Sequence, residues 1–161
     1  MKFKVPFVFA LLLAMVGLVA AAPAQASDAQ LRKVVKQQEK KSEPATKKFV
    51  EVAESIEDPS DLEEVQQASE ELRSALATYR KAVTPVKTSS SKGKQGKTKL
   101  LSALKEMTTG LTQFESFIDK AQGGASKSEL ESARKKFQKH LDKSEKLGDE
   151  ALELLGIESA S

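Results

Sequence analysis

Apolar residues recur every three or four positions in four separate stretches of this 161-residue chain, and this spacing constrains the fold more than any other feature. Such a stripe lies along one face of an α-helix, and that face must be buried against a neighbouring element. No stretch after residue 26 alternates apolar and polar residues as a half-buried strand does. The sequence therefore predicts an all-α fold. The second stripe is typical of the four: Leu62, Val65, Ser69, Leu72, Leu76, Tyr79 and Val83.

Turn-forming residues separate the stripes and set the expected helix boundaries. The sequences DPSD at 58–61 and GGAS at 123–126 are short turns, and short turns make neighbouring helices antiparallel. The prediction is an up-down-up-down antiparallel four-helix bundle over residues 27–161. Its helices are expected at about 28–57, 60–84, 97–122 and 126–155.

Local signals refine the ends of these helices. Pro44 lies within the first stripe, where proline removes a hydrogen bond, so we expect a kink or a break near Ser42–Pro44. Ser60 with Glu63 has the spacing of a capping box, which predicts the start of the second helix. The fourth helix is expected to be capped by Ser126, or by Ser128 with its glutamate three residues on.

Residues 85–96 contain almost nothing that could enter a core, and we expect them to form a flexible basic connector between two hairpins. A solvated loop is the plain interpretation. The alternative is docking on an anionic envelope surface, such as lipid headgroups or cell-wall polymer. The surface-binding candidates are Lys87, Lys92, Lys94, Lys97 and Lys99. A phosphate-binding loop is rejected, because Ser91 stands where the Walker pattern needs glycine and no buried strand precedes it.

The first 26 residues have the organisation of a signal peptide. Lys2 and Lys4 precede an apolar run over Val5–Ala22, and Ala24-Gln25-Ala26 supplies the small-x-small cleavage pattern. We expect cleavage after Ala26, with an uncleaved membrane anchor as the alternative. The protein is therefore predicted to be exported, either to the periplasm or secreted, with a bacterial source favoured. Membrane insertion is predicted only through the uncleaved leader.

Charge and cysteine content exclude several kinds of partner and chemistry. The precursor has a formal net charge of +3, and loss of the leader leaves 24 basic and 23 acidic residues. A near-neutral chain gives no electrostatic case for a nucleic acid partner. The absence of cysteine removes disulfides, thiolate metal sites and a cysteine nucleophile.

Polar residues are predicted to collect at one level of the bundle. Counting back from the turns places the only histidine, the only tyrosine and one methionine in one slice, together with glutamine and serine. A buried polar layer is one interpretation. The second is that His140 lies off the stripe, with Leu141 pointing inward and no layer at all. A ligand pocket is the third. The candidate residues for cofactor binding are His140, Met107, Tyr79 and Gln38, and the serines of the slice are Ser42 and Ser144.

The layout resembles the exported four-helix haem proteins of the cytochrome b562 type. It shares a signal peptide, two hairpins, a long loop between helices two and three, and a histidine in helix four. That family pairs this histidine with a methionine near the start of helix one, where this chain has Leu31, Val34 and Val35. With a single histidine, a di-iron or zinc centre is rejected, and no cofactor or metal is predicted.

These observations predict a non-catalytic binding or interaction protein of the cell envelope or extracellular space. No nucleophile, base and orienting group can be assembled from the pattern. The partner is expected to be an unidentified protein or an anionic envelope surface. The alternative function is a carrier of haem or of a small hydrophobic ligand in the bundle core. A monomer is expected, and exchange of hairpins between two chains is a further hypothesis.

Overall fold

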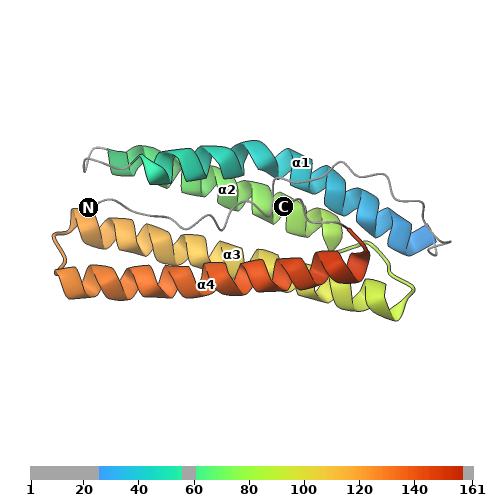
Figure 1. The fold of residues 1–161 in the computed structure, drawn as a ribbon. Helices are drawn as coiled ribbons and strands as arrows, with labels where there is room; N and C mark the ends of the chain where they lie inside the picture. Colours follow the sequence, from blue (N-terminus) through green and yellow to red (C-terminus); the bar gives the residue numbers. More distant parts are fainter. Residues whose placement is uncertain (1–25, 56–60, 158–161) are drawn as a thin grey trace.

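The computed structural model of this chain describes residues 26–55 and 61–157, which form four α-helices. Their bounds are Ala26–Glu54 (α1), Leu62–Val83 (α2), Ser91–Gln122 (α3) and Lys127–Leu155 (α4). α1 packs on α2 and α3 packs on α4, and contacts between α2 and α3 join the two hairpins (Figure 1). The expected up-down-up-down four-helix bundle is confirmed. The predicted signal peptide, apart from Ala26, and Ser60 with its capping box lie outside the described residues.

The four apolar stripes meet in one continuous core. Leu72, Phe114 and Phe137, which come from three different helices, are 0%, 4% and 8% exposed. The ring centroid of Phe114 lies 5.3 Å from that of Phe49 on α1 and 5.0 Å from that of Phe137 on α4. Burial of each such side chain contributes about 1.5–3 kcal/mol, so this aromatic cluster holds both hairpins together.

α1 continues through Pro44, so of the kink or break expected near Ser42–Pro44 the break is wrong. The proline is exposed, and two hydroxyl groups near it bond to carbonyl oxygens of the same helix. The Ser42 hydroxyl, two residues before the proline, donates to the carbonyl oxygens of Gln38 at 3.0 Å and Glu39 at 3.1 Å. Thr46 donates in the same way to the Ser42 carbonyl at 3.0 Å. Hydroxyl groups that bond back to the preceding turn often bend a helix without breaking it.

The flexible connector predicted over 85–96 is wrong at its second half, because α3 already begins at Ser91. Gly93 and Gly96 lie inside its first turns, although glycine disfavours a helix by about 1 kcal/mol relative to alanine. Close packing explains them. A Cβ at Gly93 would lie 2.6 Å from the Asp28 carboxylate, and one at Gly96 would lie 2.8 Å from Leu155 Cγ.

The shorter connector that remains is fixed at both of its ends. The Asp28 carboxylate accepts hydrogen bonds from the backbone N–H groups of Ser89 at 2.9 Å and Ser90 at 3.3 Å. The Ser90 hydroxyl, as the largest cause, and these two backbone bonds lower the pKa of Asp28. Lys97 donates to the carbonyl oxygens of Thr84 and Val86, both at 2.6 Å. The start of α1 is thereby joined to the start of α3.

The turn between α3 and α4 is formed by the glycines and the capping serine that the sequence predicted. Gly124 has φ = 72°, a conformation that favours glycine, and Gly123 ends α3. Ser126, and not Ser128, caps α4: its hydroxyl accepts from the Glu129 N–H while the Glu129 carboxylate accepts from the Ser126 N–H at 2.9 Å. This reciprocal pair is a complete capping box.

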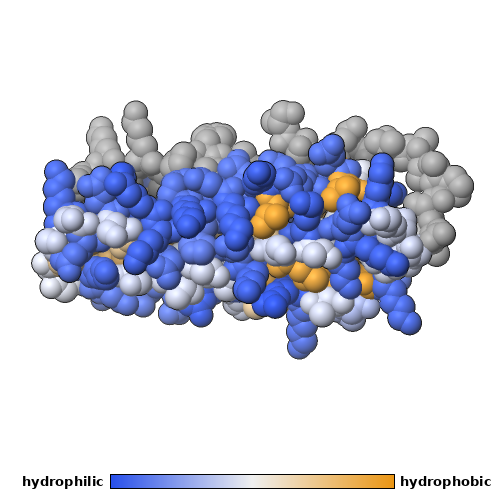
Figure 2. Space-filling view, turned by 90° about the horizontal axis from the view of Figure 1, so that it is seen from below, coloured by the Kyte–Doolittle hydropathy of each residue, from blue (hydrophilic) through white to orange (hydrophobic). Residues whose placement is uncertain are grey.

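The outer surface is mostly hydrophilic. Figure 2 shows charged and polar side chains over most of the face formed by the second hairpin, with apolar groups gathered in one half of the view. Half-exposed apolar residues of this hairpin include Leu101, Leu147 and Leu154. Within the described residues, none of the helices combines the length and the apolar character needed to cross a lipid bilayer.

Candidate functional site

A half-open cavity of about 60 Å³ lies between α1 and α4, at the level of the predicted polar slice. Its wall includes residues from all four helices, among them Tyr79 of α2 and Met107 of α3, two of the four predicted cofactor-binding candidates. α1 and α4 make few close backbone contacts, which leaves room for this space. Most of the wall is apolar, with Leu76, Leu100, Leu104 and Leu152 as its largest members.

Glu39 is the principal polar residue of the cavity, and the sequence analysis did not identify it. The residue is only 8% exposed, and its Oε2 atom has no hydrogen-bond partner among the described residues. Burial raises the pKa of its carboxyl group to about 7, although the neighbouring Lys36 acts in the opposite direction. A signal was present: Glu39 follows Val35 by four positions and adjoins Gln38, so it borders the predicted stripe.

Tyr79 is the second unsatisfied polar group in the cavity wall. It is 1% exposed, and its hydroxyl group has no hydrogen-bond partner within the described part of the chain. Burial, followed by the negative charge of Glu39, raises the pKa of this phenol well above its ordinary value of 10. Buried polar groups in proteins almost always have a partner, so two without one at the same cavity form an unusual arrangement.

The two serines of the slice are satisfied within the protein. Ser144 lines the cavity, but its hydroxyl donates to the Ala103 carbonyl oxygen at 2.9 Å. Ser42 bonds to its own helix as described above. Gln38 is buried at 8% exposure yet does not line the cavity. The interpretation as a structural polar layer therefore fits the serines and does not account for Glu39 or Tyr79.

His140 lies outside the core, so its predicted place in the slice is wrong. Its side chain is 29% exposed at the seam between α3 and α4, and Nδ1 lies 2.7 Å from Glu106 Oε2. Lys143 donates to the other oxygen of Glu106 at 2.6 Å, and together these bonds lower the pKa of Glu106, with Lys143 as the larger cause. Leu141, the next residue, is fully buried and occupies the inward position. The part of the second interpretation that places His140 off the stripe and Leu141 inward is therefore correct.

The five predicted surface-binding lysines have two different environments. Lys97 caps the end of α2, and Lys99 forms an ion pair with Glu150 of α4, so both serve the fold. Lys87, Lys92 and Lys94 are exposed, and none of the ion pairs in the described residues includes them. The basic surface at this end is therefore smaller than the sequence suggested.

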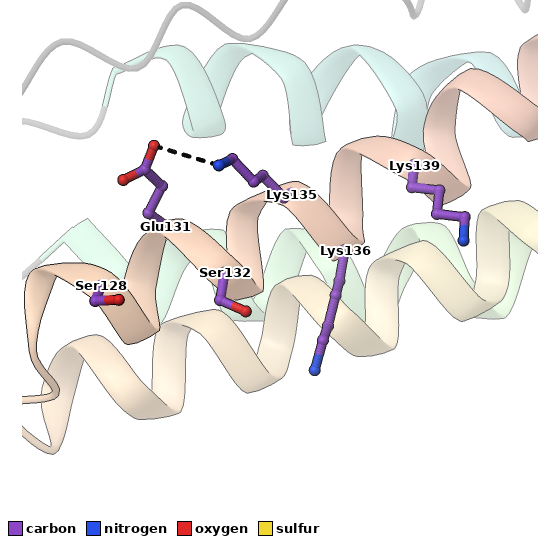
Figure 3. A pocket seen from close by; sticks show the side chains of 6 residues that line it. All are labelled: Ser128, Glu131, Ser132, Lys135, Lys136 and Lys139. Carbon is purple, nitrogen blue, oxygen red and sulfur yellow. Dashed lines mark ion pairs between the residues drawn. The ribbon is translucent and has the colours of Figure 1, made fainter.

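A second surface of basic residues lies along α4. Figure 3 shows Lys135, Lys136 and Lys139 along this helix, with Lys135 directed toward Glu131. Glu131 lies 3.8 Å from Lys135, one turn along the same helix. Because all the residues that line this hollow come from α4, it is an open helix face and encloses no ligand space.

Comparison with known proteins assigns no family to this fold. Family models, curated protein sequences and solved structures were all searched, and none matches the chain significantly. The functional assignment of the cavity therefore rests on its geometry. That geometry does not provide a haem-ligand pair, because His140 is bonded to Glu106 at the surface while Met107 faces the cavity.

Proposed function

We propose that this chain is a non-catalytic, exported binding protein whose ligand site is the cavity between α1 and α4. The observation that supports this proposal is the pair of buried, unpartnered polar groups at an otherwise apolar cavity, Glu39 Oε2 and the Tyr79 hydroxyl. A few convergent polar groups in an apolar wall are typical of small-molecule sites. Leaving them unsatisfied destabilises the free protein by about 1–3 kcal/mol each, and a matching ligand removes that cost.

The size of the cavity limits the ligand. Sites for drug-sized molecules measure about 300–1,000 Å³, whereas this one measures about 60 Å³. The ligand is therefore a molecule of a few non-hydrogen atoms, or a larger one that inserts a short arm. Glu145 and Gly148 of α4 are half-exposed wall residues, so the arm enters beside α4. A haem group does not fit this space.

Enzymatic activity is not proposed, because the residues that could take part are separated. His140 and Glu106 form a base and an orienting carboxylate at the surface, whereas the Ser144 hydroxyl is buried and donates to a backbone carbonyl. A hydrolytic site needs the nucleophile within hydrogen-bond reach of the base.

Native mass spectrometry of the purified protein tests the proposed function. We expect a bound small molecule, or a saturable response of the Met107 methyl group in NMR spectra to a panel of alcohols, amines and short carboxylic acids. Ala103→Leu, which fills the cavity wall, should abolish that response, and Ala82→Leu on the outer part of α2 is the control. If none of the compounds in the panel gave a saturable response, the proposed site would be contradicted.

A second candidate function is docking of the connector end on an anionic envelope surface. Lys92 and Lys94 lie in the first turn of α3, which contains no acidic residue. Cations at a helix N-terminus oppose the helix dipole, so the fold gains nothing from them there. This placement favours a role outside the fold.

Vesicles that contain phosphatidylglycerol test this second function, with phosphatidylcholine vesicles as the reference. Each lysine near an anionic bilayer contributes about 1 kcal/mol, so Lys92→Gln with Lys94→Gln should weaken binding about 30-fold. The control pair is Lys40→Gln with Lys41→Gln, which removes the same charge from exposed positions of α1. Binding should also weaken steeply with salt and survive His140→Ala. If the two double variants lost vesicle binding equally, a specific role of the connector end would be contradicted.

A further inference from the structure

The charges around the cavity between α1 and α4 restrict the class of ligand further than its size does. Two carboxyl groups line it, Glu39 from α1 and Glu145 from α4, and no lysine or arginine does. Burial, followed by the nearby Asp149 and Asp142, raises the pKa of Glu145. Both groups therefore lie where negative charge is poorly stabilised by the protein. Such a site attracts a positively charged ligand and repels an anion.

The unpartnered groups of the cavity favour an ammonium group, because one of them is a carboxylate. Glu39 Oε2 and the Tyr79 oxygen are both buried and unpartnered, and both belong to residues that line the same cavity. An ammonium group has three N–H donors, so it bonds to both acceptors at once, and charge assistance strengthens the bond to the carboxylate. An alcohol also reaches both groups, by donating to Glu39 and accepting from the Tyr79 hydroxyl, but it has no positive charge to pair with the carboxylate.

The wall of the cavity favours an organic cation over a metal ion. Calcium requires six to eight oxygen ligands and magnesium a near-octahedral set. Among the residues that the structure describes, no group of three or more histidine, cysteine, aspartate or glutamate side chains is arranged to hold a metal. The remaining wall is formed by leucine, alanine and methionine side chains, which match an alkyl chain.

We propose that the cavity binds a short aliphatic ammonium ion, which donates hydrogen bonds to Glu39 Oε2 and the Tyr79 oxygen and places its alkyl chain against Leu104 and Met107. The inference rests on the proposed function, since it specifies the ligand of the same site. A free short-chain amine and the amine-bearing arm of a larger molecule share this chemistry. Both present the same group to the cavity.

NMR titration with n-propylammonium chloride, compared with 1-propanol at equal ionic strength, tests the inference. The reporter is the methyl group of Met107, which lies in the cavity wall. We expect saturable binding of propylammonium that is at least about tenfold tighter than that of propanol, because it adds a charge-assisted bond. Glu39→Gln keeps the shape of the side chain and should remove that preference. Tyr79→Phe should weaken propylammonium binding while retaining a preference over propanol.

The controls separate this inference from the proposed function. Glu70→Gln removes an exposed carboxylate of α2 and should leave the preference unchanged. Propanol binding as tightly as propylammonium would overturn the ammonium inference and leave the cavity as a ligand site. A preference that persists in Glu39→Gln would overturn it as well. No saturable response to either probe would overturn both, and the cavity would then hold water only.

Discussion

Replacement of Glu39 by glutamine should make the protein more stable at alkaline pH. Its carboxyl group has an ordinary pKa of 4.5 and a pKa of about 7 when buried in the fold. Between these two values the unfolded chain has released the proton and the folded chain still holds it. Stability therefore falls as the pH rises from 4.5 to about 7, and the loss is complete above that range.

The two pKa values give the size of this effect. Each pH unit between them corresponds to about 1.4 kcal/mol, so ionisation of Glu39 lowers the free energy of unfolding by about 3 kcal/mol above neutral pH. The groups around it are Lys36 on α1, Tyr79 on α2 and Glu145 on α4, and α3 contributes no titratable side chain to the cavity wall. The pKa of Glu145 is also raised, so ionisation of Glu145 adds to the loss of stability as the pH rises. The contribution of Glu39 alone is isolated by the mutation.

Urea denaturation followed by circular dichroism at about pH 5 and about pH 8 measures the effect. Relative to the wild type, Glu39→Gln should gain about 2.5 kcal/mol more at the higher pH than at the lower one. Glu70→Gln, on the exposed face of α2, should show no such difference. If Glu39→Gln shows the pH dependence of the wild type, or loses stability at about pH 8, the argument from an unpartnered buried carboxyl group is refuted.

Three further substitutions test how the connector and the helix seams are held. Asp28→Ala leaves two backbone donors of the connector unpaired and should cost about 1–3 kcal/mol at neutral pH; because the pKa of Asp28 is lowered, the difference from wild type should close as the pH falls below 3.8. Gly96→Ala forces Cβ to within 2.8 Å of Leu155, so unfolding measurements should show a net loss of about 1–2 kcal/mol despite the better helix propensity, while Gln95→Ala on the exposed side should not. His140→Ala removes a partly exposed pair and should change the free energy of unfolding by less than about 1 kcal/mol, with no Soret band in the absorption spectrum of either protein.

The helical pattern was predictable because it depends on local spacing alone. Leu72 and Phe137 belong to stripes that the sequence defines, and both are buried in the core. The end of α3 at Gly123-Gly124 also follows from local chemistry, since a left-handed residue there needs glycine.

The start of α3 was not predictable in the same way. Gly93 and Gly96 disfavour a helix in isolation, and their reason for being there is the close approach of Asp28 and Leu155 from two other helices. Contacts between distant parts of the chain decide this boundary. A reading of local propensity assigns such residues to a loop.

The candidate site was only partly predictable for a related reason. Sequence spacing placed Tyr79 and Met107 at one level, and both line the cavity. It did not fix the rotation of each helix, which moves His140 to the surface and Glu39 inward. A small rotation of a helix about its own axis decides whether a side chain at the edge of an apolar stripe is buried or exposed.

A carbon-13 NMR titration of the Glu39 side-chain carboxyl group tests the central claim most directly. The claim is that this group is buried at the cavity without a partner that stabilises its charge. The account predicts a titration midpoint near pH 7 in the free protein. A midpoint near 4.5, the ordinary value, would show a solvated or paired carboxylate and would contradict the account.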